Sequence, residues 1–101
     1  MRPRPPWMSE TDDAILEFYE SLAEAGFRVA LPPTVVWANL TKELQIIDRS
    51  RNTISNRMRR LTKAELLEVT DEKRRYYRIT DKGLAYLNDE LEYADLQLRT
   101  D

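Results

Sequence analysis

Residues 49–63, which read RSRNTISNRMRRLTK, combine a helical apolar repeat with strong positive charge. Ile54, Met58 and Leu61 recur at helical spacing, which predicts one buried stripe on a helix over about residues 51–64. The window holds six basic residues and no acidic residue, although the 101-residue chain has a formal net charge of −2. A basic helix on an acidic chain indicates a surface that meets an anion, and nucleic acid is the usual large one.

The side of this helix opposite the stripe carries amide and guanidinium groups. Asn can bond adenine at two atoms and Arg can bond guanine in the same way, so these residue types read base edges. Asn52 and Asn56 lie one helical turn apart and can address one groove, whereas the later basic residues suit phosphate. The alternative is a solvated face with no binding role. Two observations disfavour it, because Asn is unfavourable inside a helix and the clustered like charges repel each other with no acidic neighbours to offset them. The predicted DNA-binding residues of this window are Arg49, Arg51, Asn52, Ser55, Asn56, Arg59, Arg60 and Lys63.

The sequence before this window predicts two further helices. The first is capped by Ser9 and ends at a left-handed Gly26, and a short strand over residues 27–31 follows it. The second covers about residues 34–44 and buries Val36 and Leu40. Ser50 or Asp48 is expected to cap the basic helix.

Two alternating apolar runs around a polar turn predict a hairpin, with strands over about residues 67–70 and 75–79. Its core face is expected to carry Leu67, Val69, Tyr77 and Ile79. The turn holds three cations that can lie against a phosphate backbone, namely Lys73, Arg74 and Arg75. Asp71 and Glu72 bring negative charge to the same tip, so an ordinary hairpin with mixed surface charge is the alternative.

Thr80 is expected to cap a last helix of about eighteen residues. Its apolar residues Leu84, Leu87, Leu91, Ala94 and Leu98 are spaced three and four apart, which is a short heptad seam. The second half has little core left to cover, so a second copy is expected to cover it in a homodimer. The predicted dimerisation residues are Leu87, Leu91, Ala94 and Leu98, and a helix docked entirely on its own domain is the alternative.

The first eight residues are Pro-rich and are expected to be an extended arm. A disordered tail is predicted, and insertion of Arg2 and Arg4 into a minor groove is the alternative. Trp7 and Met8 are expected to pack at the domain edge. The pattern assigns no place to Trp37, which fits the core, an interface or the surface.

Composition excludes several classes of function. Cys is absent, which excludes a disulfide framework and thiol chemistry. His is absent as well, which removes the commonest general base and metal ligand, and two Gly in all leave no Gly-rich phosphate loop. No apolar run approaches the length that spans a bilayer. We therefore expect a cytoplasmic protein that is not an enzyme, with no catalytic, metal or cofactor-binding residues and no membrane partner.

Three segments resemble winged helix-turn-helix DNA-binding proteins. Residues 52–69, with ISNRMRRL and then AELLEV, resemble the recognition helix of that family and the turn into its first wing strand. Residues 77–87, YRITDKGLAYL, resemble the exit from the wing, and their Thr-x-x-Gly-x-x-Tyr-Leu spacing is the more specific motif. The opening residues 7–17, WMSETDDAILE, look like the haloarchaeal regulators similar to the phi-H phage repressor. Together the matches cover most of residues 7–93.

The resemblance implies an α+β, mostly α fold with a three-helix core, a two-stranded wing and a C-terminal helix. Its division would be an arm over 1–8, the winged domain over 9–80, and a packing and dimerisation helix over 81–101. It implies a small archaeal transcriptional regulator, a repressor that binds double-stranded DNA without a cofactor. A winged-helix protein–protein interaction module is the alternative. The family usually has Gly where Glu65 stands, so Glu65 must either adopt a left-handed conformation or extend the helix by a different turn.

Overall fold

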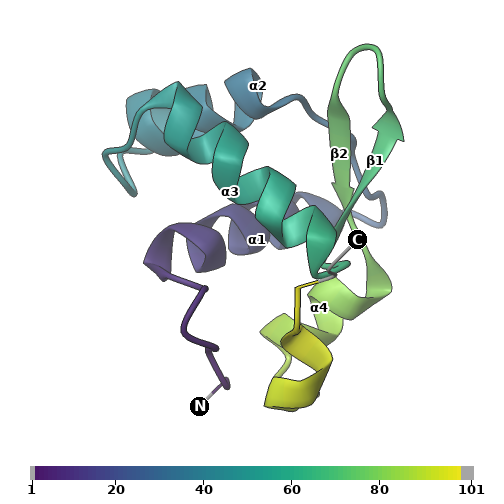
Figure 1. Cartoon of the computed structure of the whole chain (residues 1–101). Helices are drawn as coiled ribbons and strands as arrows, with labels where there is room; N and C mark the ends of the chain where they lie inside the picture. The colour runs from purple at the N-terminus through teal and green to yellow at the C-terminus, as the bar shows by residue number, and fades with distance from the viewer. Residues whose placement is uncertain (1, 99–101) are drawn as a thin grey trace.

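Within residues 2–98, which the computed structural model describes, the chain forms a mostly helical fold with one antiparallel hairpin (Figure 1). The elements in order are α1 (Glu10–Ala23), α2 (Pro33–Trp37), the π-helical η1 (Ala38–Glu43), α3 (Arg51–Lys63), β1 (Leu67–Asp71), β2 (Tyr76–Ile79), α4 (Asp81–Leu87) and the 3-10 helix η2 (Tyr93–Leu96). This order confirms the predicted fold class. Residue 1 of the predicted arm and residues 99–101 of the predicted last helix lie outside this description. No helix of the described part is both long enough and apolar enough to cross a membrane.

Helix α1 begins after Ser9, as predicted, because Asp12 satisfies a donor at the start of the helix. The Asp12 carboxylate accepts a hydrogen bond from the Ser9 backbone N–H at 2.8 Å, which is half of a capping box. The helix ends at Ala23, and the chain then turns through Gly26, which has a φ of 98° that favours glycine.

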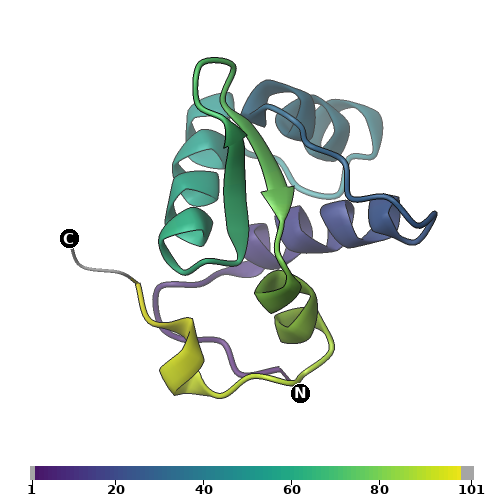
Figure 2. The ribbon, with the colours of Figure 1, turned by 90° about the vertical axis from the view of Figure 1, so that its right-hand side faces the viewer.

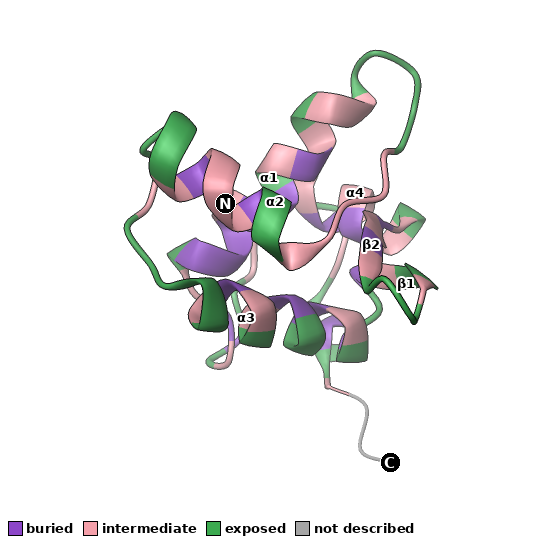
Figure 3. Ribbon diagram, turned by 90° about the horizontal axis from the view of Figure 1, so that it is seen from above, coloured by how far each residue is buried: buried purple, intermediate pink, exposed green. Residues whose placement is uncertain are grey.

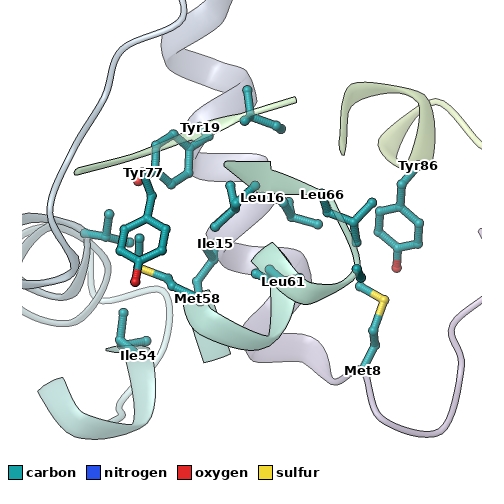
Figure 4. Packing of buried hydrophobic residues seen from close by; sticks show 14 of the residues in the cluster. Met8, Ile15, Leu16, Tyr19, Ile54, Met58, Leu61, Leu66, Tyr77 and Tyr86 are labelled. Carbon is teal, nitrogen blue, oxygen red and sulfur yellow. The ribbon is translucent and has the colours of Figure 1, made fainter. Parts of the chain in front are cut away.

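Apolar stripes from the helices and the hairpin meet in one core (Figure 4). The fully buried side chains include Ile15, Leu16 and Tyr19 from α1 and Ile54, Met58 and Leu61 from α3. Val36 and Leu40 from the second helical stretch are also fully buried, as predicted. The stripe of α3 faces α1, so the rotation of α3 about its own axis is determined by packing.

The strand predicted over residues 27–31 reduces to one bridge, between Leu31 and Tyr77. Phe27 is exposed, so the start of this segment has no apolar surface to pack on. The prolines at positions 32 and 33 follow directly, and they have no N–H with which to extend the pairing. The segment therefore contributes one residue pair, joined by two backbone hydrogen bonds, to the edge of β2.

The hairpin pairs Leu67 with Ile79 and Val69 with Tyr77, and the register shifts between Val69 and Asp71. Leu67, Tyr77 and Ile79 are buried, as predicted. The prediction that Val69 faces the core is wrong, because Val69 is 37% exposed. It lies further toward the tip of the hairpin than Leu67.

Residues 64–66 connect α3 to β1 in a Schellman turn. The Glu65 N–H donates to the Thr62 carbonyl at 3.0 Å, and the Leu66 N–H donates to the Leu61 carbonyl at 2.9 Å. Glu65 has a φ of 65°, so the left-handed conformation is the correct one of the two predicted geometries.

The closing helix α4 packs directly on this turn. Thr80 caps α4 by accepting a hydrogen bond from the Gly83 N–H at 3.0 Å, and its hydroxyl donates to the Glu65 carbonyl at 2.6 Å. A Cβ added to Gly83 would lie 2.4 Å from the Leu66 carbonyl oxygen, which is too close for any side chain. The spacing of Thr80 and Gly83 therefore marks a close contact between α4 and the turn.

The predicted eighteen-residue last helix is wrong. Helix α4 ends at Leu87, and Asp89 turns the chain with a φ of 58° before η2 begins. Leu96 of η2 is then fully buried in the core of the same chain. The predicted seam of Leu87, Leu91, Ala94 and Leu98 consequently does not lie along one helix face. Asn and Asp favour turns, and this local signal outweighed the apolar repeat.

The N-terminal arm is docked on the domain, so the predicted disordered tail is also wrong. The Arg2 guanidinium lies 2.9 Å from Glu17, and that of Arg4 lies 2.5 Å from Asp13. Trp7 packs against the edge of the core, as predicted, and its indole N–H donates to the carbonyl of Leu96 at 2.8 Å, whereas Met8 is buried within the core. Figure 2 shows the arm and the C-terminal segment together at one end of the molecule.

Candidate nucleic-acid interface

Helix α3 presents the predicted base-reading residues to solvent. Ser50 caps the helix by accepting a hydrogen bond from the Thr53 N–H at 3.1 Å, which selects Ser50 over Asp48 as the cap. The side opposite the buried stripe is exposed along its length (Figure 3). Its exposed predicted residues are Arg51, Asn52, Asn56, Arg59, Arg60 and Lys63, and Ser55 is half-buried.

A groove joins the start of α3 to the tip of the hairpin. It is lined by the α3 residues Arg51, Asn52 and Ser55, the tip residues Lys73, Arg74 and Arg75, and residues 32–34 at the start of α2. The two predicted sets are far apart in sequence, and the fold brings them together in the lining of one surface hollow. The groove is therefore strongly cationic. Among the described residues, Asn56, Arg59, Arg60 and Lys63 continue the α3 face outside it.

Asp71 has a structural role at the hairpin tip. Its Oδ1 accepts a hydrogen bond from the Arg74 backbone N–H at 3.0 Å, which closes the turn. Its other oxygen lies 3.9 Å from Arg74 Nε. Asp71 therefore stabilises the turn that carries the three cations, and it also neutralises part of the charge of Arg74.

Two of the exposed α3 residues contact each other. Arg59 donates a hydrogen bond to the side-chain oxygen of Asn56 one turn earlier. This contact aligns the guanidinium and the amide side by side on the exposed face.

Arg57 is bound to a buried carboxylate, unlike the other basic residues of α3. Its Nε donates to Asp12 Oδ1 at 2.9 Å, its terminal nitrogen donates to Asp12 Oδ2, and the same nitrogen reaches the Trp7 carbonyl. The Asp12 side chain is 0% exposed and that of Arg57 is 19% exposed. Because Asp12 accepts its hydrogen bonds, the pKa of the Arg57 guanidinium is raised above its ordinary value. Its position beside the apolar stripe was the one sequence signal for this role.

Trp37, which had no assignment from sequence, lies against the start of α3. Its indole N–H donates to the Arg49 carbonyl at 2.9 Å. The guanidinium of Arg51 lies 5.4 Å from the ring centroid, and the ammonium of Lys42 lies 5.6 Å from it. Both distances are within the range of cation–π attraction.

Comparisons with known proteins agree with this geometry. The family model of the winged helix-turn-helix phage repressor matches residues 1–99. The crystal structure of the PhiH1 repressor-like protein from Haloarcula marismortui is similar, with a TM-score of 0.72 at 28% sequence identity, over 98% of this chain and 96% of that chain. No curated protein gives a significant match. With its capped and outward-facing basic helix and the hairpin beside it, the chain belongs to the winged helix-turn-helix phage repressor family and is a DNA-binding regulator.

Proposed function

We propose that this protein is a sequence-specific repressor that reads the major groove of double-stranded DNA with α3 and contacts the phosphate backbone with the wing, the β1–β2 hairpin. The observation that carries the proposal is the cationic groove between the start of α3 and the wing tip. An α-helix fits into a major groove, and the adjacent backbone then lies beside it at the tip. Occupying a promoter in this way would block transcription.

The roles follow from residue type and from position on α3. Asn52 and Asn56 suit adenine, and Arg51 suits guanine, because these side chains make two hydrogen bonds to those bases. Arg49, Arg59, Arg60 and Lys63 suit phosphate, as do the three cations of the wing tip. Such contacts release counterions, so the affinity should fall steeply as salt rises.

We also propose that two copies bind DNA as a homodimer. The described chain measures 33 × 30 × 28 Å, which is close to the roughly 34 Å between successive major grooves on one face of DNA. Two copies side by side would therefore place their α3 helices in adjacent turns of the DNA major groove.

The C-terminal segment is the proposed dimer contact. Leu87, Leu91 and Leu98 are half-buried against the chain's own core, and Ala94 is exposed on the C-terminal segment. If that segment forms the contact, Ala94→Glu should halve the sedimentation mass, and an unchanged dimer would place the interface elsewhere.

Selection from random-sequence and genomic DNA at several salt concentrations tests the repressor proposal. We expect one enriched motif with two half-sites, and no enrichment at any salt would refute sequence-specific binding. Arg59→Ala should weaken binding to the enriched duplex, because it removes an exposed α3 cation. Arg28→Ala is the matched control, since it makes the same charge change at an exposed ion pair with Asp81, outside the groove. Equal losses in the two variants would mean that net charge, rather than the α3 face, sets the affinity.

A further inference from the structure

Trp37 touches two residues at the start of α3 without belonging to the DNA-contacting set. It is the last residue of α2, and it is half-buried against the core. Its indole N–H holds the Arg49 carbonyl, and the hydroxyl of Thr41 approaches the same oxygen at 3.4 Å. Arg49 immediately precedes the cap residue Ser50, so these bonds position the connection just ahead of α3.

The ring of Trp37 also restrains the Arg51 side chain. Arg51 is exposed at the first position of α3, and among residues 2–98 no acidic side chain forms an ion pair with it. The indole face 5.4 Å from its guanidinium is the group that favours one orientation. Arg51 lines the groove that faces the wing tip, so a restrained Arg51 is already ordered on the proposed DNA surface.

We propose that Trp37 is a positioning residue for base discrimination, acting through Arg51. The proposal rests on the function proposed above. A free arginine must lose much rotamer freedom when it engages a base, and a stacked arginine has already lost part of it. The effect should therefore concern the base that Arg51 reads and should vanish when Arg51 is absent. A Trp37 that merely packs would instead lower the melting temperature and weaken binding to every DNA alike.

A double-mutant cycle between Trp37 and Arg51 tests this proposal. The variants are Trp37→Met, which fills space without a ring, Trp37→Phe, Arg51→Ala, and each Trp37 change combined with Arg51→Ala. The probes are a duplex enriched by the wild-type protein from a random pool and a duplex of scrambled sequence. Leu44→Ala is the control, because Leu44 is exposed just beyond η1 and outside the groove. Melting curves of every variant accompany the binding measurements.

Trp37→Met should weaken binding to the enriched duplex by about two- to fivefold, the factor that one exposed cation–π contact supplies. Trp37→Phe should lose less, because a phenyl ring still faces the guanidinium. Neither change should add a loss in the Arg51→Ala background, and binding to the scrambled duplex should stay constant. If the melting temperature of Trp37→Met lies below the assay temperature, so that this variant is unfolded, the Trp37→Phe cycle decides the question with a smaller expected loss.

Additive losses in the Arg51→Ala background, or equal losses on both duplexes, would overturn the positioning role. Such a result would leave the repressor proposal intact, because the wild-type protein would still discriminate between the duplexes. If the wild-type protein enriches no duplex at all, the repressor proposal itself fails. The two failures are therefore distinguishable within one experiment.

Discussion

Replacing Arg57 by methionine should lower stability rather than DNA affinity, although Arg57 lies on the proposed recognition helix. Its guanidinium makes a two-pronged contact with Asp12, which is 0% exposed, and Arg57 itself keeps 19% of its side-chain surface in water. Removing one partner of a fully buried ion pair destabilises by about 3–5 kcal/mol, because the other charge stays buried alone. The partial exposure of Arg57 reduces the expected loss to about 2–4 kcal/mol.

Thermal unfolding followed by circular dichroism measures this loss. For a domain of this size each kcal/mol shifts the midpoint by about 4–8 °C, so Arg57→Met should melt roughly 8–32 °C below the wild type. Arg59→Met is the matched control two positions later. Arg59 is exposed, so its replacement should change stability by less than about 0.5 kcal/mol and should weaken DNA binding instead.

The pair can be isolated with Asp12→Asn. If the two side chains stabilise each other, Asp12→Asn combined with Arg57→Met should destabilise by less than the sum of the single changes, by about 1–3 kcal/mol. A midpoint for Arg57→Met within about 3 °C of the wild type would refute the reasoning, since that shift is under 1 kcal/mol. So would a loss of DNA affinity equal to that of Arg59→Met at a temperature where both variants are folded.

Three further outcomes are expected. Gly83→Ala should destabilise by about 1–3 kcal/mol in urea unfolding, because its Cβ would meet the Leu66 carbonyl at 2.4 Å, and a wild-type midpoint would contradict this contact. Glu65→Gly should stabilise by up to about 1 kcal/mol because φ is 65°, whereas Glu65→Ala should give no such gain. Burial raises the pKa of Tyr19 and Tyr86 above the ordinary tyrosine value, so the unfolded chain releases these protons first. Stability should therefore be constant up to about pH 10 and fall above it, by up to about 1.4 kcal/mol per pH unit for each tyrosine, and a flat profile to pH 11 would contradict it.

The parts of the fold that local sequence encodes were predictable. The buried stripe of α3, its Ser50 cap, the presence of the hairpin and the Thr80 cap of α4 all follow from spacings within a few residues. The path of the C-terminal segment was not predictable, because apolar residues spaced three and four apart fit a partner helix as well as the chain's own core. There the turn at Asp89 determines the path of the chain.

The residue types of the candidate surface were predictable from the sequence. The residues that hold this surface in place were not. Arg57 has the same chemistry as Arg59 and Arg60, and its partner Asp12 lies 45 residues away in the chain. Trp37 acquires a place only when the start of α3 packs against it. Such roles depend on contacts between distant segments, which periodicity along a single chain does not reveal.

The contact between the arm and the C-terminal segment also bears on the order of folding. The Trp7–Leu96 hydrogen bond joins residues 89 apart, whereas the Tyr19–Leu31 bond joins residues 12 apart. In a flexible chain, closing the longer loop costs about 1.8 kcal/mol more in entropy. The helices and hairpin can form first, and they then hold the two ends near each other, which removes most of that difference. The arm and the C-terminal segment should therefore close last and open first as one cooperative unit, so that they fray together while helix α3 stays formed.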